Sequence, residues 1–372
     1  MHVLFHSSWY PNRLQPTLGN FVQRHAECVA TMHDVTVLHT VADPGTPSVQ
    51  LVEQQRGRLR EIIAYHPPGH VGALTRIKVL RSLLGALPTV DVIHGHVLNP
   101  AATSMLWLRR TLDAPLVVTE HWTGYHQRFG LPVNWALRAV MRRAAARASV
   151  ICPVSDDLGR AMRRHGLQGH YRTVPNVVDT ELFRPATTPT NGGPFRLLHV
   201  STLHDPQKNI SGLIRAFASA LTREPRLRLV LAGDGDHAPY LPLVRSLGLD
   251  GTAIRFPGAF APAGIADLMR DADAFVLPSR YENSPVVILE AMASGLPVLA
   301  TRVGGIAEQI TEGRGQLIAP DDHDALVQGM LTLARGGTPF DAAEVRAHAL
   351  RTFSIPVVAA KYEACYRFAM EG

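Results

Sequence analysis

Residues 274–301 read AFVLPSRYENSPVVILEAMASGLPVLAT, with a short apolar run at each end and a longer mixed segment between them. The two end runs, AFVLPS and PVLAT, have the length and composition of buried strands. Residues 285–294 predict a helix between them. A strand, a helix and a second strand in this order are typical of a parallel sheet with helices on both faces.

The same alternation extends over most of the chain. In the first half, strand-like runs lie near residues 2–7, 34–40, 60–66, 91–94, 115–120, 149–154 and 171–175. Residues 184–194, RPATTPTNGGP, have the composition of a linker, and strands and helices alternate again after them. We therefore expect an α/β protein with two doubly wound, Rossmann-like domains, 1–180 and 181–350, which face each other across a cleft. Ligands of such domains bind beyond the carboxyl ends of the strands.

The composition is that of a soluble globular protein, with 46% hydrophobic and 18% charged residues in a chain of 372. The sequence has no run of about 18 apolar residues, so we expect no membrane-spanning helix. The first residues, MHVLFHSSWYPN, do not have the pattern of a secretion signal, so we expect a cytoplasmic protein. Cys28, Cys152 and Cys365 lie far apart, which argues against a disulfide framework and against a zinc site.

The positive charge is concentrated in the first half of the chain. Residues 1–180 hold 19 Lys and Arg against 11 Asp and Glu, whereas residues 181–372 hold 18 against 20. A basic half is compatible with a nucleic acid, an anionic membrane surface or a phosphorylated substrate. It is equally compatible with a solvated, arginine-rich surface. No DNA-binding or RNA-binding motif is visible, so a nucleic-acid-binding protein is the less favoured alternative.

The start of the helix near residue 285 has the features of an anion site. Ser284 is a favoured N-cap and Pro285 a favoured first helical residue. The amides of Val286 and Val287 then belong to the first turn, where N–H groups lack helical partners and meet the positive end of the helix dipole. Two carboxylates, Glu282 and Glu290, flank this turn and would accept hydrogen bonds from hydroxyl groups. Their alternative role is to stabilise the dipole and to pair with an arginine.

Lys208 is the second candidate for anion binding. The chain has only three lysines, Lys78, Lys208 and Lys361, against 34 arginines. Lys208 follows a strand and precedes a helix, a position from which an ammonium group reaches a phosphate. Together with the helix start it favours a diphosphate ligand. The sequence GDGD at 233–236 does not follow the first strand of a domain, which argues against a dinucleotide fingerprint.

The order of VSTLHDPQKN, LAGDGD, RFPG and FVLPSRYENSPVVILEAMASGLPVLATRVGG resembles the nucleotide-binding half of the retaining family 4 glycosyltransferases, which have the two-domain GT-B fold. The resemblance covers most of residues 170–320. It implies a nucleotide-diphosphosugar donor, with UDP-sugar favoured, and no metal or other cofactor. It also implies a sugar or lipid-linked acceptor, retention of anomeric configuration, and a terminal helix, 351–372, that crosses back to the first domain.

The resemblance also assigns roles to matching positions. Glu282 would contact the donor sugar and Glu290 the ribose, while Lys208 and the amides of Val286 and Val287 would bind the diphosphate. This assignment makes Lys208 and Glu282 part of the catalytic set. A GT-B epimerase or phosphorylase is the alternative within the same fold.

Other donor contacts follow from the same resemblance, with two departures. The RFPG loop, which begins at Arg255, would line the base, and Gly19 would approach the diphosphate from the first domain, with Asn20 a weaker candidate. Thr202 stands where many members have an arginine beside the lysine, so one cation on the leaving group is missing. Pro285 replaces a common glycine and removes one N–H donor.

The first half offers candidates for chemistry and for acceptor binding. His121 and His96 each end a strand, where an imidazole is able to exchange protons near neutral pH. The resemblance favours His121 as the catalytic histidine. Trp122 and Arg128 follow in a loop and, together with His96, are candidate acceptor contacts.

Residues 133–148 predict a helix that carries both apolar and basic side chains. Arg138, Arg142, Arg143 and Arg147 recur at near-helical spacing beside Trp135. Such a helix suits the surface of an anionic membrane at its inner face. The alternative is an ordinary solvated helix between two strands.

Overall fold

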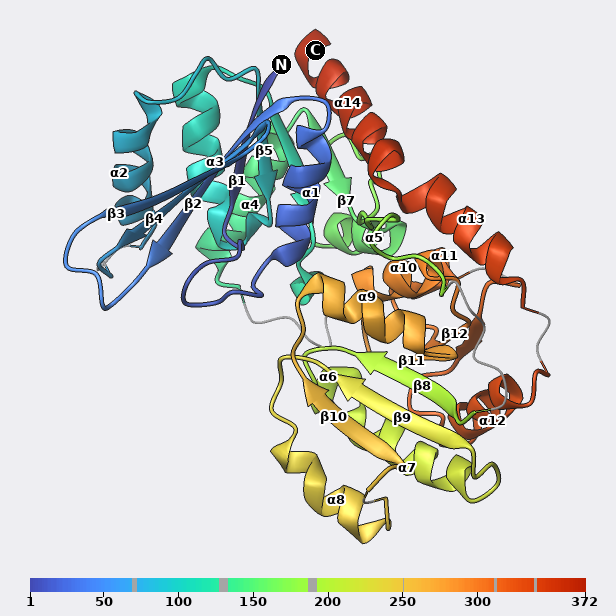
Figure 1. Ribbon diagram of the computed structural model, residues 1–372. Coiled ribbons are helices and arrows are strands. Elements are labelled where there is room, and N and C mark those ends of the chain that lie inside the picture. Colours follow the sequence, from blue (N-terminus) through green and yellow to red (C-terminus); the bar gives the residue numbers. More distant parts are fainter. Residues whose placement is uncertain (69–71, 127–132, 187–192, 250, 311–312, 338–339) are drawn as a thin grey trace. The chain divides into compact units, whose positions relative to one another are not determined.

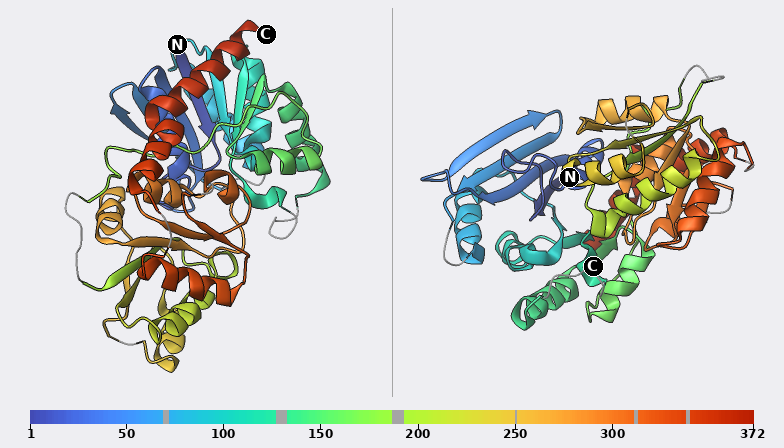
Figure 2. Two further views of the ribbon diagram at one scale, coloured as in Figure 1. Left: turned by 90° about the vertical axis from the view of Figure 1, so that its right-hand side faces the viewer. Right: turned by 90° about the horizontal axis from the view of Figure 1, so that it is seen from below.

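The computed structural model describes residues 1–68, 72–126, 133–186, 193–249, 251–310, 313–337 and 340–372. The chain divides into two compact units, which Figures 1 and 2 show. Unit 1 comprises Met1–Val177 and Ile355–Gly372, and unit 2 comprises Val178–Ser354. Each unit contains one sheet with helices on both faces, so the predicted fold class, two Rossmann-like α/β domains, is confirmed.

The sheet of unit 1 has seven strands in the order β3-β4-β2-β1-β5-β6-β7. All neighbouring strands are parallel except β3 and β4, which are antiparallel. The strands are β1 (His2–Ser7), β2 (Asp34–Ala42), β3 (Gln50–Arg56), β4 (Leu59–His66), β5 (Val92–His96), β6 (Leu116–Glu120) and β7 (Val150–Pro153). Every residue of β1 is buried, as expected for a central parallel strand.

Two features of this sheet differ from the prediction. The sequence analysis missed β3, QLVEQQR, because all seven of its residues are exposed and it lacks the apolar alternation of a half-buried strand. The strand expected at 171–175 is wrong. Only Tyr171 pairs there, in an isolated bridge to Ile151.

Helices cover both faces of this sheet. One face carries α2 (Gly72–Leu84), α3 (Leu98–Leu112), α4 (Trp135–Arg147) and α5 (Asp156–Arg164), which share a core with residues such as Leu4 and Ile93. The other face carries α1 (Asn20–Ala30) and the C-terminal α14 (Ile355–Glu371), whose side chains pack with Val3 and Phe5. Figure 2 shows α14 lying across the strands of unit 1. No described helix is long and apolar enough to cross a bilayer.

The sheet of unit 2 has six parallel strands in the order β10-β9-β8-β11-β12-β13. They are β8 (Phe195–Val200), β9 (Leu227–Ala232), β10 (Ile254–Gly258), β11 (Ala274–Leu277), β12 (Val298–Thr301) and β13 (Gln316–Ile318). The chain runs outward from β8 through β9 to β10 and then returns to place β11 on the other side of β8. The strand order therefore reverses between β8 and β11, and this reversal is the usual place for a ligand.

The helices of unit 2 also form two layers (Figure 1). One layer contains α9 (Pro262–Asp271), α10 (Val286–Ala293) and α13 (Ala342–Phe353), and the other contains α7 (Ile210–Leu221) and α12 (His323–Ala334). Three short helices lie in connecting segments: α6 (Asp205–Lys208), α8 (Leu241–Ser246) and α11 (Ile306–Gln309).

Candidate active site

The segments that follow β8 and β11 meet where the strand order of unit 2 reverses. Lys208 is the last residue of α6, after β8, and Glu282 lies after β11. Their side chains form an ion pair, with 2.5 Å between Lys208 Nζ and Glu282 Oε1. The side chains are only 11% and 7% exposed, respectively. The sequence predicted both residues in one site, but it did not predict that they pair with each other.

The carboxylate of Glu282 is held from a second side. The Ser279 hydroxyl donates to Glu282 Oε1 at 2.8 Å, and the Thr301 hydroxyl at the end of β12 donates to the Ser279 carbonyl. A lysine has three N–H donors. The bond to Glu282 uses one of them, so the ammonium group retains donors for an oxygen-rich ligand.

The start of α10 differs by one residue from the prediction. Pro285 has non-helical angles, φ −67° and ψ 120°, and precedes the helix rather than beginning it. The prediction that Ser284 caps the helix is wrong, because Pro285 occupies the N-cap position and no side chain of the described residues caps α10. The buried Ser284 hydroxyl instead accepts a hydrogen bond from Gln309 Nε2 of α11 at 2.9 Å. Val286 and Val287 still form the first turn.

The first turn of α10 presents N–H groups ahead of the helical hydrogen bonds. The Ile288 amide donates to the Pro285 carbonyl at 3.2 Å, so these bonds begin at Ile288. The amides of Val286 and Val287 precede it and belong to the N–H groups that a helix leaves for a cap, water or ligand. Glu290 lies farther along α10 and is 3% exposed.

Arg280 is a functional candidate that the sequence analysis missed. Its guanidinium donates to the Asp205 carbonyl, to Asn209 Oδ1 and to Asp321 Oδ1, each at 2.7 Å. Its amide donates to the Gln207 carbonyl at 2.8 Å. Arg280 thus ties α6, which ends in Lys208, to the segment that carries Glu282. The signal available in the sequence was the position of this arginine, just after the strand β11 and two residues before Glu282.

Two glycines allow the backbone of the site to pack closely. A Cβ on Gly304, which has a φ of +50°, would lie 1.7 Å from the Glu282 carbonyl oxygen. A Cβ on Gly235, in the GDGD segment, would lie 1.9 Å from the Thr202 carbonyl oxygen. Close packing against the segment after β8 therefore accounts for Gly235, in agreement with the prediction that GDGD is no dinucleotide fingerprint.

The two remaining donor candidates of unit 2 lie near its surface. Thr202 is exposed and lies two residues after Val200, the last residue of β8. Arg255 is exposed on β10, the edge strand, where the register with β9 shifts between Arg255 and Gly258. A polar side chain on an edge strand is accessible to a ligand without further rearrangement.

In unit 1, the backbone conformation and the close packing at position 19 require a glycine. It precedes α1 with a φ of +69°, and a Cβ there would lie 2.5 Å from the Trp9 carbonyl carbon. Only glycine fits this turn. Asn20, the weaker candidate, is the first residue of α1 and is exposed.

The two candidate histidines of unit 1 are neighbours in the core. His96 Nδ1 lies 3.2 Å from His121 Nε2, and the two rings are stacked. Burial lowers the pKa of both imidazoles well below the ordinary value of 6.5. Both are therefore neutral at pH 7, and the role of either imidazole in proton exchange stays a prediction. A neutral imidazole remains a hydrogen-bonding group.

A buried carboxylate that the sequence analysis missed positions His121. Glu120 is fully buried at the end of β6, and it accepts hydrogen bonds from the amides of His121, Trp122 and Leu98 at 2.8–3.0 Å. It also accepts one from the Tyr125 hydroxyl at 3.0 Å. Burial raises the pKa of Glu120, and the amide hydrogen bonds oppose this rise.

The predicted acceptor contacts have different outcomes. Trp122 is 7% exposed and packs against the Tyr125 ring with 5.2 Å between centroids, so the structure places it in the core rather than open to an acceptor. Arg128 lies outside the described residues.

Two family models match the chain in succession. Residues 18–182 match Glycosyltransferase Family 4, and residues 194–335 match Glycosyl transferases group 1. The fold and these matches define an enzyme of the glycosyltransferase class. The chain belongs to the family 4 glycosyltransferases, as the sequence motifs indicated.

Individual relatives agree with this assignment. Glycogen synthase of Mycobacterium tuberculosis (strain CDC 1551 / Oshkosh) is 29% identical, over 94% of this chain and 89% of the relative. Phosphatidyl-myo-inositol mannosyltransferase of Mycobacterium leprae is 28% identical, over 88% and 87%. The structure of Anabaena HepE in complex with UDP has a TM-score of 0.77 at 20% identity, and the alignment covers 98% of this chain and 99% of that chain. The structural likeness supports the two-domain GT-B fold.

Proposed function

We propose that the protein transfers a hexosyl group from a nucleotide-diphosphosugar, with UDP as the nucleotide, to a glycan or lipid-linked acceptor. The observation that carries this proposal is the buried Lys208–Glu282 pair at the strand-order reversal of unit 2. Glu282 lies four residues before Val286, the first residue of α10. The pair provides a cation for a diphosphate and a carboxylate for sugar hydroxyls. The UDP in the HepE structure supports the choice of nucleotide.

The difficult step in glycosyl transfer is the departure of a diphosphate from the anomeric carbon. Negative charge grows on the leaving oxygen as the C–O bond breaks. Lys208 and the Val286 and Val287 amides would stabilise that charge electrostatically. Glu282 would orient the sugar through its hydroxyls, and Glu290 would bind the ribose.

We further propose that transfer retains the anomeric configuration. The acceptor oxygen attacks from the face that the diphosphate leaves, a new C–O bond forms, and the acceptor proton passes to an oxygen of the departing diphosphate. His121, neutral in its buried site, would act by hydrogen bonding to the donor sugar rather than as a proton donor. The proposed chemistry uses these side chains and amides, without a metal or other cofactor.

The α4 helix supports a membrane-surface acceptor. Trp135 is 84% exposed, and Arg138, Arg142, Arg143 and Arg147 are also exposed on this helix. Residues 135–147 contain no acidic side chain. An exposed tryptophan among arginines suits the interface of an anionic membrane. The M. leprae relative, named for a phosphatidylinositol substrate, agrees with a lipid acceptor.

Calorimetric titration with UDP-glucose, GDP-mannose and ADP-glucose tests the donor site. We expect one nucleotide class, UDP, to bind the wild-type protein and to lose at least about tenfold in affinity, about 1.4 kcal/mol, in Lys208→Ala. Lys78→Ala is the matched control, because Lys78 is an exposed lysine of α2 in unit 1. Unchanged binding in Lys208→Ala would refute this placement of the diphosphate.

A further inference from the structure

Unit 1 contains a cavity of about 280 Å³ that the donor site does not explain. It lies between the segment joining β1 to α1, the first turns of α1, and the antiparallel pair of β3 and β4. Its volume is close to the lower end, about 300 Å³, of the usual range for ligand pockets. The lining residues that decide its chemistry are Tyr10, Gln23, Val52, Gln54, Glu61 and Ile63.

The floor of the cavity follows from the register of β3 with β4. Val52 pairs with Ile63, and Gln54 pairs with Glu61. Directly opposite residues of an antiparallel pair lie on the same face, so these four side chains form one surface with an apolar half and a polar half. Leu51 directly precedes Val52 on β3, so its side chain points to the opposite face of the sheet.

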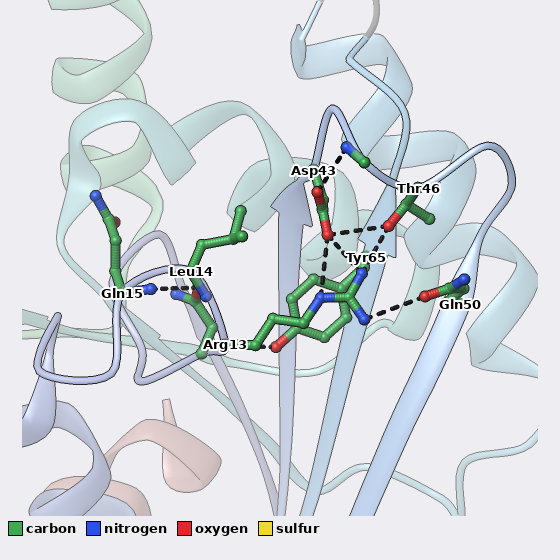
Figure 3. A network of polar contacts seen from close by, with 9 residues as sticks. Arg13, Leu14, Gln15, Asp43, Thr46, Gln50 and Tyr65 are labelled. Atoms are coloured by element: carbon green, nitrogen blue, oxygen red, sulfur yellow. Dashed lines mark hydrogen bonds and ion pairs between the residues drawn. The ribbon is translucent and has the colours of Figure 1, made fainter.

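The roof of the cavity is fixed by a network around Arg13, which Figure 3 shows. The Arg13 guanidinium donates to Asp43 Oδ2 at 3.0 Å and to Gln50 Oε1 at 3.1 Å, and it lies 3.9 Å above the centre of the Tyr65 ring. The Arg13 amide donates to the Tyr65 hydroxyl at 2.9 Å. The loop is thereby anchored to β3 and β4, and the cavity is formed before any ligand binds.

The polar end of the cavity is built around Glu61, which is 4% exposed. Glu61 Oε1 accepts from the Tyr10 hydroxyl and from Gln23 Nε2 at 3.0 Å, and Oε2 accepts from Arg56 Nη2 at 2.7 Å. Arg56 also pairs with Glu27 at 3.1 Å. One guanidinium therefore faces two carboxylates, and a third anion would be repelled.

We propose that this cavity binds a neutral glycosyl residue. Its hydroxyls would exchange hydrogen bonds with the side-chain amides of Gln23, which Glu61 holds in place, and of Gln54. Its C–H face would cover Val52 and Ile63. The assignment of a sugar, rather than another neutral polyol, rests on the proposed glycosyltransferase function. The bound residue is either the sugar that reacts or a more distant sugar of a growing glycan.

The test measures binding of methyl α-glucoside, methyl α-mannoside, methyl α-galactoside and maltotriose to the full chain by saturation-transfer NMR, without donor. We expect at least one to bind the wild type and to lose at least about tenfold in affinity in Val52→Trp, which fills the cavity, and in Gln54→Ala. Leu51→Trp and Gln55→Ala, on the opposite face of the same strand, are matched controls with wild-type binding. All four positions are exposed, so the variants should fold.

The outcomes distinguish the two kinds of bound sugar from each other and from failure of the proposal. Binding of a methyl glycoside supports a single sugar in the cavity, and binding of maltotriose alone supports a more distant sugar of a glycan. The proposal is overturned if none of the four binds, if Val52→Trp and Gln54→Ala bind like their controls, or if glucose 6-phosphate binds more tightly than methyl α-glucoside. UDP binding in the same samples shows whether the donor site stands regardless of these results.

Discussion

At the scale of single residues, the Lys208–Glu282 pair contributes to the stability of unit 2 and to the proposed binding of the diphosphate. Two charges that are 11% and 7% exposed have lost most of their hydration, and each depends on the other to offset that loss. A diphosphate that approaches Lys208 would share its ammonium group with Glu282. The pair therefore holds the cation in place before the donor binds.

Removal of one member of this pair should destabilise unit 2. Lys208→Ala leaves a buried, unpaired carboxylate, for which we expect a loss of about 3–5 kcal/mol in the free energy of unfolding. The double variant Lys208→Met/Glu282→Gln removes both charges and should recover most of that stability while UDP binding stays lost. Urea denaturation and calorimetry measure the two effects separately. Recovery of UDP binding in the double variant would contradict the role of Lys208.

The buried histidines predict a pH dependence of stability. Burial lowers the pKa values of His25 and His39 to about 4 in the folded chain, from an ordinary value of 6.5. Between these values the unfolded chain binds more protons than the folded chain, so stability falls as the pH falls from about 6.5 to about 4. Each histidine contributes up to about 1.4 kcal/mol per pH unit within this window.

Urea denaturation of unit 1 over this pH range measures the effect. His39→Gln should flatten the dependence, because one of the contributing groups is gone. His323→Gln is the control, since His323 is exposed on α12 of unit 2. A stability that is constant from pH 6.5 to pH 4 would show that these imidazoles are not buried in the neutral form.

At the scale of secondary structure, the sequence predicted the elements that carry apolar periodicity. The β11-α10-β12 unit lies within about a residue or two of the predicted bounds. The strand β3 could not be predicted, because all of its residues are exposed and its position depends on pairing with β4. Ser284 was assigned as a cap because capping is local, whereas its partner Gln309 is 25 residues away.

The α4 helix carries a prediction at the same scale. Arg138→Glu/Arg143→Glu reverses two charges of its exposed surface, and we expect binding to vesicles with phosphatidylglycerol to fall at least about tenfold, since each basic residue near such a surface contributes about 1 kcal/mol. Arg215→Glu/Arg245→Glu, at exposed positions of unit 2, is the matched control. Equal vesicle binding by both variants in a sedimentation assay would contradict membrane contact through α4.

At the scale of the whole molecule, the chain leaves unit 1 after Val177 and returns to it at Ile355. The returning helix α14 completes the core of unit 1. Tyr366 and His94 are 2.7 Å apart through OH and Nδ1, and the Tyr362 hydroxyl lies 3.2 Å from Thr119 Oγ1. Unit 1 therefore needs the last residues of the chain, although its sheet is complete within the first 153.

This arrangement predicts that the two units respond separately to a core substitution. Tyr362→Ala removes a fully buried side chain, and we expect unit 1 to lose about 3–5 kcal/mol. UDP affinity should stay within about twofold of wild type, because Lys208 and the amides of Val286 and Val287, which we propose bind the diphosphate, all lie in unit 2. Scanning calorimetry with and without UDP tests this. Loss of UDP binding in folded Tyr362→Ala would show that the donor site depends on the core of unit 1.

The sequence predicted those parts of the candidate site that depend on local features of the chain. It did not predict those that depend on packing between residues far apart in the sequence. The scarcity of lysine and the sequence at the start of the helix predicted Lys208, Val286 and Val287. The sequence could not show that burial keeps His121 neutral or that Glu120 holds it in place, because both depend on residues brought together by folding.

The most direct test of the central claim observes the amides of α10 themselves. In full-length protein labelled with ¹⁵N-valine, UDP should shift the amide resonances of Val286 and Val287, identified by Val286→Ile and Val287→Ile, to an extent that saturates with UDP binding. Hydrogen bonds from these N–H groups to the diphosphate would move their protons downfield. Saturable UDP binding that leaves both resonances unmoved would show that the diphosphate is bound elsewhere.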